Sequence, residues 1–167
     1  MLYVPSIRDY NPFYIQGSGA SSATDILTTY KVVVKTHDYP SFRRPKEPYK
    51  NDWKDEHGDD EYTAQLFFEA FSFKAECAMF ASGVTARADL NAGIRAFMDY
   101  LSGGEFSTYD AWTGFGFRKV RLAEFKMPSE GDFDEMDGYA RVIFTVEFKV
   151  NDPMTRMVLS NGSIVTA

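Results

Sequence analysis

One stretch near the C-terminus alternates apolar and polar residues more regularly than any other part of the chain. Its apolar members lie two residues apart, and they are Ala140, Val142, Phe144, Val146, Phe148 and Val150. The intervening residues, among them Arg141 and Lys149, are mostly polar. Successive side chains of a β-strand point to opposite faces, so the pattern predicts a strand with one buried face. Asn151-Asp152-Pro153 ends it, because proline cannot donate the next ladder hydrogen bond.

A second segment carries the spacing of an amphipathic helix. Leu90, Ile94, Phe97 and Leu101 recur at intervals of four, three and four residues, which draws one apolar stripe. The spacing predicts a helix over about 85–102. Thr85 suits its N-terminal cap, and Gly103-Gly104 ends it because glycine adopts the left-handed conformation readily.

Further strands are expected from β-branched or alternating runs at 31–36, 117–126, 156–159 and 163–166. The last two are joined by Asn161-Gly162, a turn typical of β-hairpins. Residues 128–138 are acidic and rich in turn formers, which predicts a loop. The sum is an α+β fold that is mainly β: an antiparallel β-sandwich or split barrel with one flanking amphipathic helix.

The segment 62–80 fits two periods. Phe71, Phe73 and Cys77 fall on alternate positions, as one face of a strand requires. Phe68, Phe71 and Ala75 also fit one face of a helix, and short apolar runs often allow both interpretations. The density of aromatic residues favours a long, bent strand. Cys77 is the only cysteine, so no disulfide forms within the chain, and we expect it to be buried as a small apolar residue.

The domain organisation is predicted from breaks in these patterns. Residues 1–30 contain Pro5, Pro12 and a small polar run, which indicates an N-terminal arm that a neighbouring subunit would order. Residues 31–167 are expected to form a single β-rich domain. Within it, the polar, proline-containing stretch 37–61 predicts a long projecting loop, and connections of this length are usually functional or bound to a partner.

The net charge and the distribution of charged residues limit the functions that this chain is expected to have. The formal net charge is −6, and no Lys- or Arg-rich stripe stands out, which argues against specific nucleic-acid binding. The acidic run 52–61 offers oxygen ligands for a hard cation. Its order does not fit an EF-hand, because Gly58 at the sixth position would place Trp53 at the first. A solvated loop is the favoured interpretation, and cation binding stays open.

No catalytic, cofactor-binding or metal-binding motif is present in the sequence. Gly-x-Ser-x-Gly, His-Glu-x-x-His and phosphate-cradling glycine loops are absent, so we expect no enzymatic activity and no cofactor. We also expect no signal peptide and no membrane segment. An aromatic platform for a carbohydrate could be formed by Tyr109, Trp112, Phe115 and Phe117, although aromatic residues more often pack a helix against a sheet. A carbohydrate-binding β-sandwich module that uses Tyr109 and Trp112 is therefore the alternative function.

Three stretches together carry a resemblance to a known family. They are Phe97–Gly104 (FMDYLSGG), Tyr109–Gly114 (YDAWTG) leading into Val120-Arg121-Leu122, and Val142–Pro153 (VIFTVEFKVNDP). Their order resembles structural proteins of long-tailed bacteriophages, in particular the distal-tail and tail-tube family. The loop Lys50–Tyr62 also looks like tail proteins of phages that infect gut Bacteroidetes.

The resemblance implies a structural component of the tail or baseplate that acts by homo-oligomeric assembly. It implies a ring, usually a hexamer, around a channel through which DNA passes without specific binding. Partners would be copies of the chain and neighbouring tail proteins, and the location would be the virion tail, assembled in the bacterial host cytoplasm. Distal-tail proteins usually carry a further C-terminal domain, so tube, distal-tail, terminator and hub roles all stay open.

Overall fold

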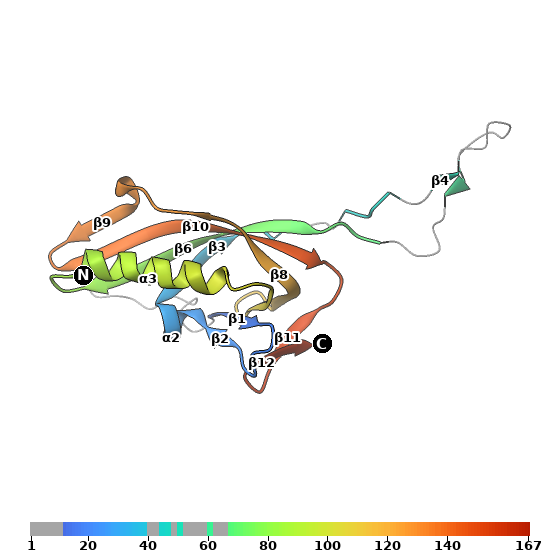
Figure 1. Ribbon diagram of the computed structural model, residues 1–167, viewed down its shortest axis with the longest axis horizontal. Helices are drawn as coiled ribbons and strands as arrows, with labels where there is room; N and C mark the ends of the chain where they lie inside the picture. Colours follow the sequence, from blue (N-terminus) through green and yellow to red (C-terminus); the bar gives the residue numbers. More distant parts are fainter. Residues whose placement is uncertain (1–11, 40–43, 48–49, 52–59, 62–66) are drawn as a thin grey trace.

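The computed structural model describes residues 12–39, 44–47, 50–51, 60–61 and 67–167 (Figure 1). Its main sheet has eight strands in the order β2-β1-β7-β8-β10-β6-β3, with β9 pairing to β10. They are β1 (Phe13–Gly17), β2 (Thr24–Asp25), β3 (Val32–His37), β6 (Phe71–Ser82), β7 (Phe106–Asp110), β8 (Phe115–Lys126), β9 (Phe133–Met136) and β10 (Tyr139–Asp152). The other elements are α2 (Ile26–Tyr30), α3 (Ala86–Leu101), the 3-10 turn η1 (Glu130–Asp132), and the hairpins β4 (Lys50–Asn51) with β5 (Asp60–Glu61) and β11 (Met157–Ser160) with β12 (Ser163–Thr166).

Strand β10 is the centre of the sheet. It pairs antiparallel with β6 from Tyr139 opposite Ser82 to Val150 opposite Phe71, and with β8 along its other edge. Every second side chain from Ala140 to Val150 is buried, as the alternation predicts. The buried face points towards α3, which lies along the sheet (Figure 1).

The sheet curls into an antiparallel half-barrel, and the fold is mainly β, as the sequence predicts. Two irregularities in β8 accompany the curl. One interrupts its pairing with β7 near Lys119, whose φ is 52°, and the other interrupts its pairing with β10 between Glu147 and Phe148. A bulge bends a strand and increases its twist, so β8 is where the sheet turns around the helix.

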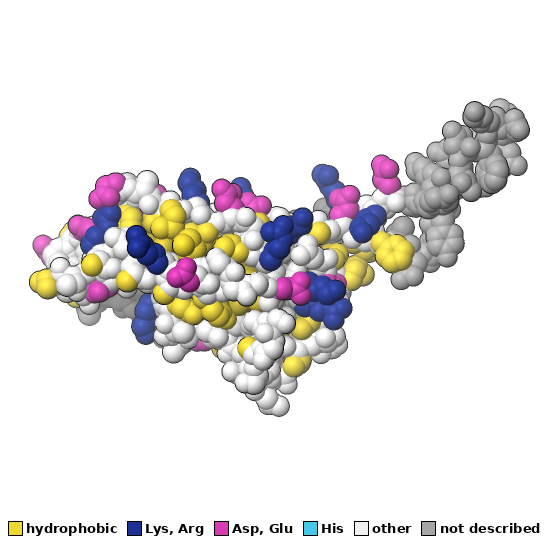
Figure 2. Space-filling model, viewed as in Figure 1, with side chains coloured by type: hydrophobic (Ala, Val, Ile, Leu, Met, Phe, Trp, Pro, Cys, Tyr) yellow, Lys and Arg dark blue, Asp and Glu magenta, His cyan; other side chains and the backbone are white. Residues whose placement is uncertain are grey.

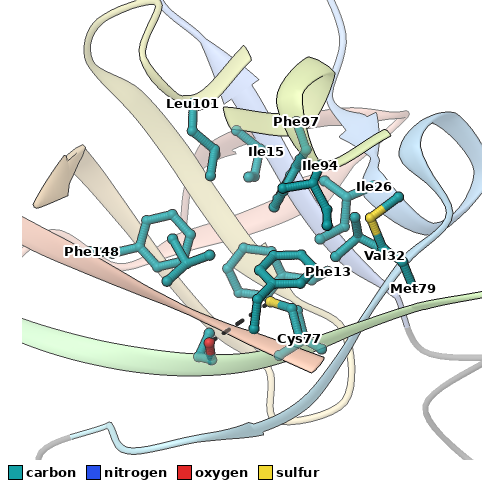
Figure 3. Close-up of a cluster of buried hydrophobic side chains, with 14 of the residues drawn as sticks. Phe13, Ile15, Ile26, Val32, Cys77, Met79, Ile94, Phe97, Leu101 and Phe148 are labelled. Carbon is teal, nitrogen blue, oxygen red and sulfur yellow. Dashed lines mark hydrogen bonds between the residues drawn. The ribbon is translucent and has the colours of Figure 1, made fainter. Parts of the chain in front are cut away.

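Helix α3 fills the concave side of the half-barrel. Leu90, Ile94, Phe97 and Leu101 are all buried, which confirms the predicted stripe. Figure 3 shows Phe97 and Ile94 pointing into a cluster that also contains Phe13 and Val32 from distant parts of the chain. Cys77 is buried in the same cluster, and its Sγ donates a weak hydrogen bond to the carbonyl oxygen of Ala75 (3.8 Å). Its expected role as a small core residue is therefore confirmed.

The hairpin β11–β12 forms a partial second layer over β1, β7 and β8. Asn161 and Gly162 both have positive φ (49° and 77°), as the predicted two-residue turn requires. The hairpin lies close to the sheet at Gly116, where an added Cβ would lie 2.4 Å from the carbonyl oxygen of Met157. Glycine at position 116 is thus a packing requirement.

Part of the predicted domain organisation is wrong. Residues 13–30 are not an arm: Phe13, Ile15 and Ile26 are core residues, and β1 pairs along its whole length with β7. The isolated stretch looks irregular because only a few apolar residues mark it, yet β7 supplies the hydrogen bonds that make it a strand. Residues 1–11 lie outside the described residues.

Other boundaries are also corrected or confirmed. The 62–80 segment is a strand from Phe71 onwards, as favoured, and residues 62–66 lie outside the described part. The long helix Ala86–Leu101 agrees with the predicted 85–102, although a short second helix, α2, joins it. The 128–138 loop contains a strand, β9, which extends the sheet beside β10.

Replacing Phe97 with Ala tests the contact between α3 and the sheet. The ring packs near Phe125, Phe144 and Tyr30, so its removal leaves a cavity in the core. We expect the free energy of unfolding to fall by about 3–5 kcal/mol in a urea titration. Arg95→Ala on the exposed face of α3 is the control and should change it by less than about 0.5 kcal/mol. Equal effects of the two changes would contradict this packing.

Replacing Gly116 with Ala tests the second layer. The added methyl group would collide with the backbone of Met157, so the hairpin must shift, and we expect a loss of roughly 1–3 kcal/mol. Gly131→Ala is a matched control, since nothing lies within 4 Å of its added Cβ. A Gly116→Ala protein as stable as the control would show that β11 does not pack on β8.

Candidate functional site

A two-stranded ribbon leaves the sheet where β3 ends and β6 begins. The N–H of Asp38 donates to the carbonyl oxygen of Lys74 (3.1 Å), and further out Lys46 donates to Phe67 (2.7 Å) and Glu69 donates to Arg44 (2.8 Å). Beyond these, β4 and β5 pair antiparallel. Figure 1 shows β4 far from the main sheet. The projecting loop at 37–61 stays a prediction, because residues 40–43, 48–49 and 52–59 lie outside the described part of the chain.

The described parts of the ribbon bury little. Residues 44–47 are exposed on both faces, and Phe67 is 60% exposed. A two-stranded hairpin without a third strand or a covering layer is at most marginally stable in water. Contact with another molecule that covers the ribbon would therefore stabilise it.

The opposite end of the sheet is a compact apolar tip. There the β9–β10 turn, Asp137-Gly138, has positive φ at both residues (44° and 81°), and Gly83 donates its N–H to the carbonyl oxygen of Gly138 (2.7 Å). This bond brings the turn before α3 beside the β9–β10 turn. Val84, Met136 and Tyr139 are exposed on this tip, the last two by 71% and 70%.

Arg87 at the start of α3 contacts both η1 and β9. Its guanidinium lies 3.5 Å from the ring centroid of Phe133 and donates to Glu130 (2.7 Å) and Glu135 (3.0 Å). These side-chain hydrogen bonds outweigh the effect of desolvation and raise the pKa of Arg87. One cation thus joins η1, β9 and α3.

A basic face lies near the ribbon, on β8 and β10. Arg121 and Lys149 stand directly opposite each other in the ladder, and Lys119 is exposed at the bulge. Like charges directly opposite in a sheet repel. Within the described ranges, no carboxylate forms a salt bridge with any of the three, whereas the neighbouring Arg118 is paired with Asp152 (2.5 Å). An anionic partner would relieve this repulsion.

Asp152 organises the end of β10. Its carboxylate accepts hydrogen bonds from Arg118, from the hydroxyl of Thr155 (2.8 Å) and from the N–H groups of Met154 and Thr155 (3.1 Å each). Burial acts to raise the pKa of this carboxyl, but the four hydrogen bonds prevail and hold the pKa far below its usual range. Asp152 thereby directs the chain into the β11–β12 hairpin.

The residues considered for a carbohydrate platform lie in different settings. Tyr109 is a half-buried residue of β7, opposite Tyr14 and Gly116, on the part of the sheet that β11 crosses. Trp112 lies in the following turn and is partly exposed, and its backbone N–H donates to the carboxylate of Asp110 (3.1 Å). Phe115 and Phe117 instead join the aromatic cluster around Tyr39.

Most of the acidic run 52–61 lies outside the described residues. Only Asp60 and Glu61 are described, as the backbone of β5. In the described portion of the chain, no group of three or more His, Cys, Asp or Glu side chains converges to hold a metal ion. No helix of that portion is long and apolar enough to cross a membrane.

Comparison with known proteins finds no matching family model, no matching curated protein and no matching solved structure. The function is therefore argued from the surfaces above. Sequence reasoning indicated the ribbon through its length and prolines, but it missed the apolar tip and the basic face. The one available signal for the tip was the Asp-Gly pair before the β10 alternation, which is typical of a hairpin turn.

Replacing Asp152 with Asn tests its role at the end of β10. A carboxyl whose folded pKa is lowered adds stability above its unfolded pKa, near 4, and this stability is lost as the pH falls below that value. We expect Asp152→Asn to lower the free energy of unfolding at pH 7 by about 1–2 kcal/mol and to flatten its decline below pH 4. Urea titrations across this range measure both effects. Asp99→Asn, at an exposed position of α3, is the control. If both variants show the same dependence of stability on pH, the role given to Asp152 is contradicted.

Proposed function

We propose that this chain is a structural subunit that functions by assembling with copies of itself, not by catalysis. The observation that carries the proposal is the ribbon, which projects from the half-barrel and has an exposed phenylalanine, Phe67, on its described part. Burial of the Phe67 side chain against a neighbouring subunit would remove this apolar surface from water, which favours association.

The shape of the molecule supports assembly over ligand binding. The concave side of the half-barrel is filled by α3 and its buried stripe, so the usual ligand position inside a curled sheet is taken by side chains. Exposed apolar residues instead lie on the outside: Val84, Met136 and Tyr139 at the tip, Phe67 on the ribbon, and others elsewhere, such as Trp112 and Met154. Exposed apolar residues at projecting positions are typical of protein–protein contacts.

The more specific proposal is a component of a long-tailed phage tail or baseplate, as a tube, distal-tail, terminator or hub-adjacent ring protein. It rests on the three stretches that resemble this family. A curled antiparallel sheet with a flanking helix is compatible with it. In a ring, a net charge of −6 on each subunit would repel DNA, which suits a channel wall along which DNA slides.

Deleting the ribbon tests the proposal. We expect the intact protein to have a mass by light scattering well above 19.0 kDa that rises with concentration. Replacing residues 40–69 with a short glycine-rich loop between Tyr39 and Ala70 should return the protein to the mass of its own shortened monomer, below 19.0 kDa, because the ribbon contacts are lost. Tyr39 is kept since its ring packs against Phe73 and Phe117.

The control for this deletion is a check that the shortened protein still folds. Circular dichroism and the melting temperature of the shortened protein should stay close to those of the intact protein, because the sheet closes at Asp38 and Lys74. An intact protein that remains a 19.0 kDa monomer at every concentration would contradict self-assembly. An oligomer that survives the deletion would assign assembly to surfaces other than the ribbon.

A further inference from the structure

The two ends of the sheet carry opposite charges. At the tip, residues 129–138 contain five acidic residues and no Lys or Arg, and the neighbouring Arg87 and Arg141 leave an excess of three negative charges (5 − 2 = 3). Figure 2 shows acidic side chains at the end of the molecule that carries β9, with Lys and Arg side chains among them. The tip is therefore an apolar surface with an acidic rim.

The end beside the ribbon has the opposite sign. Its basic face comprises Arg118, Lys119, Arg121 and Lys149, and Asp152 is the acidic partner of Arg118, which leaves an excess of three positive charges (4 − 1 = 3). Between the two ends, the outward residues are balanced, as Lys74 and Lys126 lie beside Glu124 and Glu147. The excess of negative or positive charge is thus confined to the two ends.

We propose that copies of this chain associate head to tail, with the acidic apolar tip of one copy seated on the basic face of the next. The excess charges are equal and opposite, and the basic residues Lys119, Arg121 and Lys149 lack a carboxylate partner among the described residues. A carboxylate rim placed against them relieves the repulsion between Arg121 and Lys149.

Apolar residues of the tip have a matching role. Tyr139 and Met136 stand opposite each other in the β9–β10 ladder and share the outward face. A tyrosine ring attracts a guanidinium or ammonium group placed over it, and the aliphatic stems of Arg and Lys cover apolar surface. The basic face thus offers partners for both the carboxylates and the exposed apolar side chains of the tip.

The two surfaces are different patches on one chain, so the contact is heterologous. Such a contact repeats from copy to copy and either closes into a ring or continues as a filament. This inference rests on the proposed self-assembly and adds to it the pair of surfaces that meet. It also assigns a role to β9, which the sequence analysis treated as a loop.

Charge reversal at each surface tests the pairing. Arg121→Glu with Lys149→Glu changes the basic face from +3 to −1 by the counts above, and Glu130→Lys with Asp134→Lys changes the tip from −3 to +1. The tip residues chosen are exposed (89% and 67%), so their ion pairs contribute little to folding. Each double variant alone should weaken self-association by at least about tenfold in sedimentation or light scattering.

Combining the reversals gives the decisive outcome. An equimolar mixture of the two double variants should reassemble, because each surface now meets one of opposite sign, and the protein carrying all four changes should also assemble. Lys74→Glu with Arg95→Glu is the matched control, since it changes the net charge as much as the reversal of the basic face does, at exposed positions outside both surfaces. Raising the salt concentration from about 0.05 to 0.5 M should weaken the association of the wild-type protein and also that of the mixed double variants.

The failures of the two proposals are distinguishable. A wild-type protein that assembles while both double variants assemble equally well overturns the head-to-tail pairing and leaves self-assembly standing. Loss of assembly on reversing the basic face, without loss on reversing the tip, also overturns the pairing, because the acidic partner must then lie elsewhere. A wild-type protein that stays monomeric overturns self-assembly and the pairing together.

Discussion

The ladder between β6 and β10 and the apolar stripe of α3 form one continuous contact on which the rest of the structure depends. The two long strands pair along their whole shared length, and alternate side chains of each strand point towards the helix. A shift of one residue in this register would move every buried side chain to the outer face. Because α3 occupies the concave side, β8 bends at its bulges, and the outer face is left to carry charge and contacts.

The elements with strong periodicity were predictable from the sequence. The alternation of β10, the stripe of α3 and the Asn161-Gly162 hairpin each depend on local patterns, and the structure confirms all three. Strands β1 and β7 were not predicted. Their buried faces mix Phe13 and Ile15 with the polar Thr108 and Asp110, so no apolar alternation marks them, and long-range pairing decides their conformation.

The candidate surfaces were only partly predictable, for a related reason. The length and prolines of 37–61 suffice to predict a projection, because such a stretch cannot bury its backbone polar groups in a core. The charge polarity depends on register. Arg121 lies beside Lys149 only because a residue is inserted between the β8 positions that pair with Glu147 and Phe148, and composition does not reveal this insertion.

Opposite charges at the two ends of one sheet place a condition on any assembly of this chain. In an open row of subunits, one acidic tip and one basic face are left uncovered, and only a closed ring covers all of them. Closure therefore gains one additional contact without further loss of translational freedom, which favours rings over short rows once the rotation between neighbours permits closure. The ribbon begins at the basic end, so it leaves each subunit on the side where the next tip would sit. Ribbon and charge would then act on the same neighbour, and loss of either would weaken a shared contact.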